Sequence, residues 1–200
     1  MMLDRLQAIV LAAGAGSRFG GGKLLAPWRG GVLLDGALAA AFASPARGVT
    51  VVWGADPAVA TAAEAFAERT GNRACLRLVH AARHAEGLSA SLAAGVAALP
   101  DDGEGVYVFL GDMPRIPGDL AAPMAEALAG GALAVAPEFQ GRRGHPVLFA
   151  KPLWPRLLTL SGDRGAGELL RELGEAVALT PAPDDGVLYD VDRREDLAEK

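Results

Sequence analysis

Short apolar runs alternate with alanine-rich segments along this chain, and this alternation is its main structural signal. The apolar runs predict strands at residues 8–12, 49–53, 76–80, 105–110, 133–136, 146–149 and 177–180. The segments of helical length predict helices at residues 32–43, 57–69, 89–99, 117–129, 152–160 and 165–173, and from about residue 193 onwards. Several strands are apolar throughout, as expected where helices cover both faces. The pattern predicts an α/β fold with a mostly parallel sheet and helices on both sides.

Composition narrows the class of protein. The chain has 200 residues, 51% of them hydrophobic, which suits one domain spanning residues 1–200. The formal net charge of −5 argues against a general nucleic-acid binder, although it permits a local cationic pocket. The single cysteine, Cys75, excludes an intrachain disulfide framework and suits a reducing compartment, so we expect a cytoplasmic protein. Neither a secretory signal nor a run of about 18 apolar residues is evident, so no membrane span is expected.

The first predicted strand runs into a loop of small residues that carries two cations. Residues 8–23 read AIVLAAGAGSRFGGGK, so glycines follow the apolar run and surround Arg18 and Lys23. Small residues let backbone N–H groups approach a polyanion, and the two cations neutralise its charge. The glycine spacing fits neither the dinucleotide fingerprint nor the P-loop. We interpret the segment as a nucleoside triphosphate site; the alternative is a flexible turn with a solvated lysine.

Other candidate residues follow later predicted strands, where open α/β sheets bind their ligands. Asp112 comes directly after strand 105–110 and is suited to hold Mg²⁺, or else to cap a helix. Gly87, Ser89 and Ser91 lie where helix 89–99 begins and are suited to shape a pocket for a base or ribose. Capping of that helix by Ser89 is the alternative reading.

Two cationic loops and an acidic segment complete the set. The motif GRRGHP contains Arg142 and His145, which suit recognition of a phosphate on a second substrate or belong to an ordinary hairpin loop. The motif SGDRGAG contains Arg164, which either helps a helix N-terminus to bind an anion or lies in a plain turn. In the motif YDVD, Asp190 or Asp192 is a candidate second metal ligand, and Asp192 also suits a cap of the terminal helix.

These pieces together resemble the MobA-like nucleotidyltransferase family, and within it the molybdenum cofactor cytidylyltransferase branch. The resemblance rests on LAAGAGSRFGGGK, GLSASLAAG, GDMP, GRRGHPVLF, GDRGAGELL and DVDRREDL, which span nearly the whole chain. It implies a three-layer α/β/α fold of the nucleotide-diphospho-sugar transferase type (Rossmann-like) and Mg²⁺-dependent transfer of a nucleoside monophosphate. The sequence LAAG, where the guanylyl branch tends to have LAGG, favours CTP over GTP. The implied acceptor is a phosphorylated molecule of the molybdopterin type, with a molybdenum hydroxylase as recipient.

The resemblance also implies roles for individual residues. Arg18 and Lys23 would hold triphosphate oxygens, and Asp112 would bind Mg²⁺ with Asp192, or alternatively Asp190, as second ligand. The residues expected to bind the nucleotide are Ala12, Ala13, Gly14, Gly16, Gly87, Ser89 and Ser91. The residues expected to contact the acceptor are Arg142, His145 and Arg164. The family's terminal motif commonly reads Asp-Thr-Pro-Glu-Asp-Leu, whereas two arginines follow Asp192 here, so the usual helix start is absent.

Three other readings remain at this stage. A sister transferase would attach the nucleotide to a sugar phosphate or polyol phosphate. A chaperone would bind a molybdopterin-type cofactor without catalysis. An NAD(P)-dependent oxidoreductase would need a dinucleotide site, which the glycine spacing disfavours.

Overall fold

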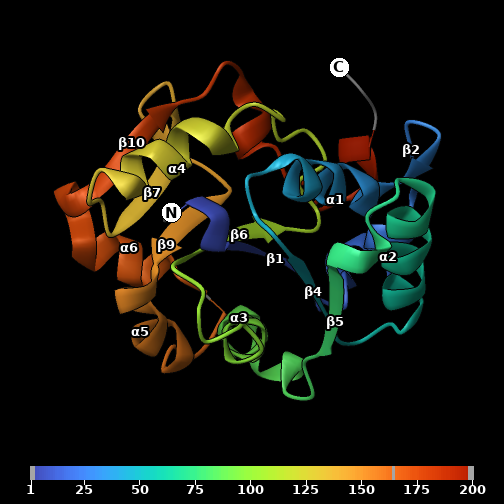
Figure 1. The fold of residues 1–200 in the computed structure, drawn as a ribbon. Coiled ribbons are helices and arrows are strands. Elements are labelled where there is room, and N and C mark those ends of the chain that lie inside the picture. The colour runs from blue at the N-terminus through green and yellow to red at the C-terminus, as the bar shows by residue number, and fades with distance from the viewer. Residues whose placement is uncertain (1–2, 164, 198–200) are drawn as a thin grey trace.

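A computed structural model describes residues 3–163 and 165–197, which fold around one central sheet (Figure 1). The strand order is β10-β7-β9-β6-β1-β4-β5, with β8 paired to β7. The strands of this sheet are β1 (Leu6–Ala12), β4 (Val49–Trp53), β5 (Leu76–His80), β6 (Gly105–Leu110), β7 (Ala134–Phe139), β8 (Arg142–Arg143), β9 (Val147–Ala150) and β10 (Val177–Pro181). Pairing is parallel for β1 with β4 and β6, β4 with β5, and β7 with β10, whereas β9 is antiparallel to both neighbours. The predicted mostly parallel sheet is confirmed.

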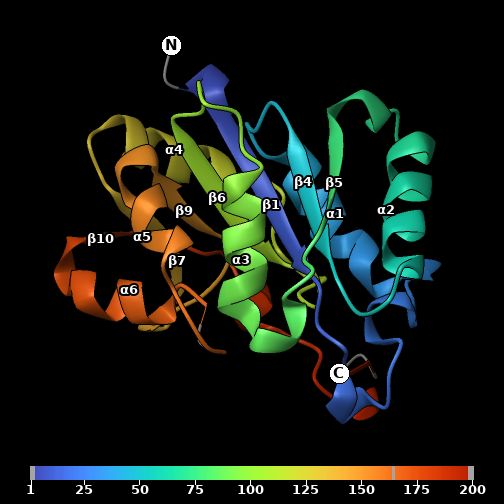
Figure 2. The same ribbon diagram turned by 90° about the horizontal axis from the view of Figure 1, so that it is seen from below.

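Helices cover both faces of the sheet, which makes the three-layer fold (Figure 2). Helices α1, α2 and α4 pack on one face, and α3, α5 and α6 pack on the other. Their bounds are α1 (Leu33–Ala43), α2 (Ala58–Arg69), α3 (Leu88–Ala97), α4 (Ala121–Ala129), α5 (Trp154–Leu158) and α6 (Gly167–Leu173). No helix among the described residues is both long enough and apolar enough to cross a membrane.

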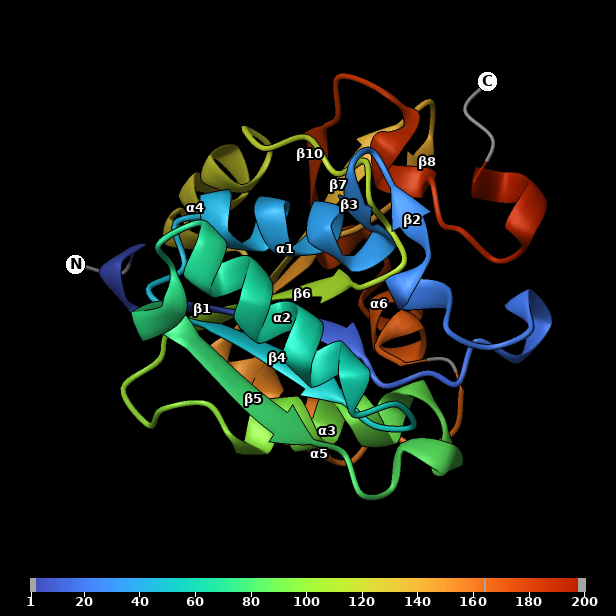
Figure 3. The same ribbon diagram turned by 90° about the vertical axis from the view of Figure 1, so that its right-hand side faces the viewer.

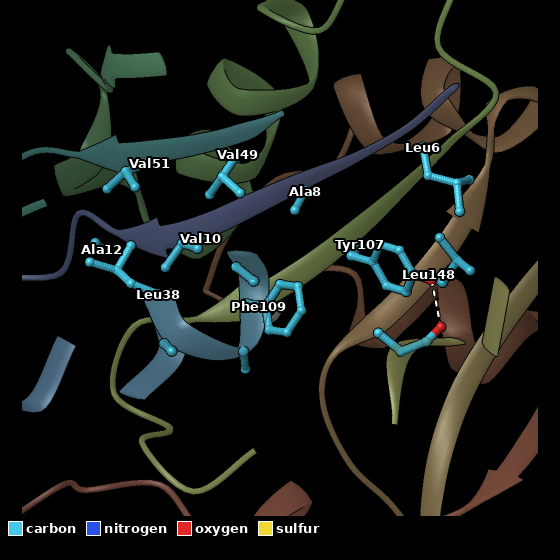
Figure 4. Packing of buried hydrophobic residues seen from close by; sticks show 14 of the residues in the cluster. Leu6, Ala8, Val10, Ala12, Leu38, Val49, Val51, Tyr107, Phe109 and Leu148 are labelled. Atoms are coloured by element: carbon cyan, nitrogen blue, oxygen red, sulfur yellow. Dashed lines mark hydrogen bonds between the residues drawn. The ribbon is translucent and has the colours of Figure 1, made fainter. Parts of the chain in front are cut away.

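Strand β1 shows why the sheet needs cover on both sides. All seven of its residues are buried, and successive side chains point to opposite faces. Ala8 and Val10 pack toward α1 (Figure 4), whereas Ile9 belongs to the core under α3. Tyr107 of β6 lies in the core that α1 covers, and its hydroxyl donates to the carbonyl of Ala121 at the start of α4 at 2.6 Å. Burial raises the pKa of Tyr107, so this hydroxyl stays protonated.

Several expected helices are shorter than their sequence patterns. The helix expected at residues 117–129 begins at Ala121, because turns occupy the segment around Pro114 and Pro117. The helix expected at residues 152–160 is reduced to α5, preceded by a 3₁₀ turn at Lys151–Leu153. The expected terminal helix is a 3₁₀ turn at Arg194–Leu197. The spacing of apolar residues alone does not distinguish a single helical turn from a helix of three turns.

The structure also contains a small hairpin that the alternation of apolar and polar residues does not signal. Strands β2 (Pro27–Trp28) and β3 (Gly31–Val32) pair in antiparallel fashion just before α1. Two residues per strand are too few for a periodic pattern.

Candidate functional site

The loop after β1 folds back on itself and returns Lys23 to the end of that strand. Gly16 has a φ of 59°, and its carbonyl accepts hydrogen bonds from the N–H groups of Phe19 (3.0 Å) and Gly21 (3.1 Å). A Cβ atom added to Gly16 would lie 3.0 Å from the Cβ of Lys23. Glycine is therefore favoured both by the left-handed backbone and by the close approach of the lysine.

The end of β6 supplies the carboxylate that meets this lysine. The N–H of Gly111 donates to the Leu11 carbonyl at 2.9 Å, so the strand ends of β1 and β6 stay paired up to the loop. The next residue is Asp112, whose Oδ2 lies 2.6 Å from Nζ of Lys23. The side chains are 24% and 14% exposed, respectively, so this ion pair is largely shielded from water. The sequence prediction that Lys23 and Asp112 share one site is consistent with this contact.

A segment near the end of the chain adds two more carboxylates. Oδ1 of Asp192 lies 3.7 Å from Nζ of Lys23, and its Oδ2 accepts from Nη1 of Arg18 at 3.0 Å. Partial burial, and then the negative charges of Asp112 and Asp192, raise the pKa of neighbouring Asp190. Ion pairs thus join four of these side chains into one network at this edge of the sheet: Arg18, Lys23, Asp112 and Asp192.

A cavity of about 510 Å³ opens beside the network. Six of the seven expected nucleotide-binding residues line it, namely Ala12, Ala13, Gly14, Gly16, Gly87 and Ser91. Lys23 and Asp112 stand at one part of its wall, and His84 and Asp163 are also in the lining. The volume is within the usual range for small-molecule sites.

Ser89, the seventh of these residues, does not line the cavity. Helix α3 begins one residue before it, with Gly87 in the cap position and no side-chain cap, so the alternative reading, that Ser89 caps this helix, is wrong. Its side chain is 0% exposed, and its hydroxyl has no hydrogen-bond partner. Gly87 has a φ of 112°, and a Cβ atom there would collide with Asp163. The loop at residues 161–163 therefore packs directly against the start of α3, where Ser89 N–H donates to the Gly162 carbonyl at 3.1 Å.

The carboxylates fit a hard divalent cation. Mg²⁺ and similar ions take oxygen ligands and commonly use one or two carboxylates together with substrate phosphates. Asp112 and Asp192 already share one cationic atom, Nζ of Lys23. Among residues 3–163 and 165–197, no three histidine, cysteine or acidic side chains are gathered as a ready-made metal cluster. Asp112 and Asp192 thus suit an ion that arrives with a phosphorylated ligand.

The expected acceptor residues lie in different environments. Arg142 is exposed on β8 and lines a separate hollow of about 610 Å³ together with Tyr189. His145 donates its backbone N–H to the Val187 carbonyl at 2.9 Å, and its buried Nδ1 has no hydrogen-bond partner. Burial lowers the pKa of His145, against the pull of Asp112, so the ring is neutral near pH 7. Arg164 lies outside the described residues.

Three residues near the site escaped the sequence reasoning. His84 lines the cavity, although no sequence motif singles it out. Asp163 also lines the cavity, and its place beside Arg164 in the motif SGDRGAG was the available signal. Asp196 accepts from the backbone N–H groups of Asp192 (3.0 Å) and Arg193 (2.7 Å), while the Asp192 carboxylate, a candidate cap, pairs with Arg18 and Lys23. The place of Asp196 in the motif EDL was the available signal.

Comparison with known proteins identifies the family of this chain. The family model described as the MobA-like NTP transferase domain matches residues 8–177. The molybdenum cofactor cytidylyltransferase of Escherichia coli (strain K12) is 29% identical over 150 residues, which cover 75% of this chain and 72% of that protein. The nicotine blue oxidoreductase of Paenarthrobacter nicotinovorans is 31% identical over 210 residues, covering 98% of this chain and 96% of that protein.

Solved structures show the same fold. A mycobacterial protein from strain JC1, described as a homologue of Rv0371c of Mycobacterium tuberculosis, has a TM-score of 0.78 and 28% identity. The alignment covers 96% of this chain and 93% of that one. Rv0371c of M. tuberculosis H37Rv in complex with manganese has a TM-score of 0.67 and 20% identity, covering 89% and 88% of the two chains.

Proposed function

Because the chain belongs to the family with a MobA-like NTP transferase domain, we propose that it transfers CMP from CTP to a phosphorylated acceptor and releases pyrophosphate. The observation that carries the proposal is the contact of 2.6 Å between Lys23 and Asp112 beside the cavity. It joins a lysine of the small-residue loop to a carboxylate of a central strand. A triphosphate and its divalent metal need this pair of charges at one place.

The proposed reaction requires no proton transfer to or from a side chain of the protein. A phosphate oxygen of the acceptor attacks the α-phosphorus of the nucleotide, a new P–O bond forms, and pyrophosphate leaves on the opposite side. The attacking phosphate is already an anion near pH 7, so no general base is required. The barrier comes mainly from repulsion and misalignment between two polyanions.

The chain's own residues are placed to lower that barrier. Lys23 and Arg18 neutralise phosphate oxygens, and the backbone N–H groups of the loop from Gly14 to Gly16 orient them. Asp112 and Asp192 would hold Mg²⁺, which supplies Lewis-acid polarisation of the phosphates when bound. Before the nucleotide arrives, these cations and carboxylates neutralise one another. The phosphates would draw the cations away from the carboxylates and so free them for the metal.

Several features favour CTP and an acceptor of the molybdopterin type. The wall formed by Ala12 and Ala13 carries the LAAG sequence of the cytidylyl branch, and the E. coli relative is a molybdenum cofactor cytidylyltransferase. Ser91 and Gly87 line the same cavity and would contact the base. The acceptor's phosphate would meet Arg142 and the segment around His145, with Arg164 as a further expected contact. A molybdenum hydroxylase in a reducing, cytoplasmic setting is the expected recipient.

Measuring pyrophosphate release with CTP, GTP, ATP or UTP tests the proposal, using Mg²⁺ and a molybdopterin preparation as acceptor. Thermal shifts with the same four nucleotides report selective binding independently of turnover. We expect Lys23→Ala to reduce turnover by roughly two to three orders of magnitude. Lys151→Ala is the matched control, because Lys151 hydrogen-bonds to the Asp101 carbonyl far from the cavity lining. Near-normal turnover in Lys23→Ala would contradict the proposal, and binding without pyrophosphate release would favour a chaperone.

One observation favours a second candidate. The nicotine blue oxidoreductase is 31% identical over nearly the whole chain, so a reductase using a nicotinamide cofactor is the competing function. The glycine spacing of the first loop does not fit the dinucleotide fingerprint. Absorbance of NADH and NADPH at 340 nm during incubation with quinonoid dyes separates the two candidates. Cofactor oxidation that depends on the protein, without pyrophosphate release from any nucleotide, would favour the reductase.

A further inference from the structure

The segment that follows the last strand returns to the nucleotide site and touches it at two points. The N–H of Val191 donates to the backbone carbonyl of Asp112 at 3.0 Å. The carboxylate of Asp192 then accepts from Arg18 at 3.0 Å. Figure 3 shows this C-terminal segment, in red, on the same side of the molecule as the blue loop that follows β1. The matching family model ends at residue 177, before this segment begins.

Apolar side chains also pack the C-terminal segment against the loop that follows β1. A small cluster separate from the two main cores contains Phe19, Trp28 and Val191, with Tyr189 and Leu197 packed against it. Phe19 is 4% exposed although it lies next to the exposed Arg18. The guanidinium of Arg194 lies over the Phe19 ring, 4.8 Å from its centroid. Phe19, the residue beside Arg18, is therefore buried in a small cluster that the C-terminal segment helps to build, and not in either main core.

The segment is itself held in shape by Asp196. This carboxylate accepts hydrogen bonds from the backbone N–H groups of Asp192 (3.0 Å) and Arg193 (2.7 Å). The backbone carbonyl of Asp196 accepts from the Tyr189 hydroxyl. The backbone hydrogen bonds lower the pKa of Asp196, so the carboxylate is ionised at neutral pH and makes charge-assisted bonds. These bonds fix the turn that carries the Asp192 side chain.

We propose that Asp196 is a positioning residue of the nucleotide site, which orders Asp192 and, through it, the loop bearing Arg18 and Lys23. The inference rests on the proposed function, because it assumes that this loop binds a triphosphate. The loop has three consecutive glycines with positive φ, Gly20 to Gly22, and so gains much freedom when its contacts are lost. Ordering it before the ligand arrives reduces the entropy lost on binding.

The test compares Asp196→Ala with Asp196→Asn, in the full chain. Asparagine keeps one oxygen that accepts from the two N–H groups, whereas alanine removes it. Asp102→Ala is the control for loss of an exposed carboxylate, because Asp102 pairs with Arg47 at 2.8 Å and lies outside the cavity lining. Hydrogen exchange of the peptide covering residues 16–26 reports loop order without any ligand. Steady-state kinetics and calorimetry with CTP and Mg²⁺ report the site.

We expect Asp196→Ala to speed exchange in residues 16–26 and to weaken CTP binding about tenfold, since it removes two charge-assisted hydrogen bonds. The KM for CTP should rise with a smaller change in kcat, because the loop's contacts hold substrate and transition state alike. Asp196→Asn should restore most of both properties. Unchanged exchange in residues 16–26 of Asp196→Ala would overturn the inference. If the wild-type chain binds none of the four nucleotides, the proposed function fails instead, and the exchange data still decide whether Asp196 orders the loop.

Discussion

At the scale of single residues, Lys23 serves as an internal counter-ion for the carboxylates of the site. Its ammonium lies 2.6 Å from Asp112 and 3.7 Å from Asp192, in the region that a divalent cation would occupy to use the same oxygens. The Lys23 side chain is only 14% exposed, so solvent screens these interactions less than it screens a surface ion pair. A metal ion without nucleotide must therefore compete with an ammonium that is already in place.

This competition predicts opposite effects of one substitution on the two ligands. Lys23→Met removes the charge but keeps a side chain of similar length, so Asp112 and Asp192 lose their cation. We expect the affinity for Mn²⁺ alone to rise about tenfold, as when one favourable charge contact of about 1.4 kcal/mol is transferred to the metal. The affinity for CTP should fall in the same protein. Calorimetry with Mn²⁺ alone and with CTP checks both, and Lys151→Met should change neither. Weaker Mn²⁺ binding in Lys23→Met would show that the lysine does not compete for these oxygens.

The burial of His145 should make the free energy of unfolding depend on pH. Burial lowers its pKa below the ordinary 6.5, so the unfolded chain takes up a proton at a higher pH than the folded chain. Below pH 6.5 the unfolded state binds more protons, and stability falls as the pH falls, until the pH passes the folded-state pKa. The limiting slope for one such group is about 1.4 kcal/mol per pH unit. Urea unfolding at pH 7.5, 6.5 and 5.5 measures it. His145→Gln should flatten the dependence, whereas exposed His80→Gln should not.

At the scale of elements, helix α1 supports the loop that carries Asp112. A Cβ atom added to Gly36 of α1 would lie 2.6 Å from Cα and 2.7 Å from the carbonyl carbon of Pro114 and would collide with the Pro114 carbonyl oxygen. The atoms it meets belong to the backbone and cannot rotate away. The helix and the loop from Gly111 to Pro114 thus pack in direct backbone contact, and Gly36 is what permits it.

Gly36→Ala should destabilise the protein and disturb the site together. Alanine favours helix by about 1 kcal/mol over glycine, but overpacking against a fixed neighbour costs about 1–3 kcal/mol, so the net effect is a loss. Moving the Pro114 backbone also moves Asp112, two residues earlier. We expect a lower urea midpoint and weaker metal-dependent binding of CTP. Gly118→Ala is the control, because no atom lies within 4 Å of the added Cβ. A Gly36→Ala protein of wild-type stability would contradict the packing argument.

The strands, turns and helices that carry the site residues determine which of these residues were predictable from the sequence. Lys23 and Asp112 were predictable as neighbours, because parallel strands gather their carboxyl ends at one edge of a sheet. For Asp196 the motif EDL was the one available signal, and periodicity could not strengthen it, because the residue lies in a 3₁₀ turn of four residues. A serine at the start of an alanine-rich run often caps a helix, which is why the sequence suggested that role for Ser89. In the structure, the loop at residues 161–163 packs against that end of α3, and the Ser89 N–H donates to the Gly162 carbonyl. Tertiary contacts decided each of these cases.

At the scale of the whole molecule, the sheet separates two apolar cores that share its strands. Leu38 of α1 belongs to one core and Leu92 of α3 to the other, and both side chains are 0% exposed. Strand β1 contributes Val10 to the first core and Ile9 to the second, so neither core can lose its packing without disturbing the same strand. We therefore propose that residues 1–200 form one cooperative domain.

Cooperativity of this kind predicts that damage to either face lowers the stability of both. Leu38→Ala and Leu92→Ala should each reduce the free energy of unfolding by about 2–5 kcal/mol, as expected for a buried leucine that leaves a cavity. Far-UV circular dichroism follows the helices of both faces, whereas tryptophan fluorescence follows the surroundings of Trp53 beside the first core and Trp154 in the second. In a two-state domain the two signals change together in every variant. A Leu38→Ala protein whose dichroism changes at lower urea than its fluorescence would mean that the faces unfold separately. The network of Arg18, Lys23, Asp112 and Asp192, which contains residues from both halves of the chain, would then depend on two units instead of one.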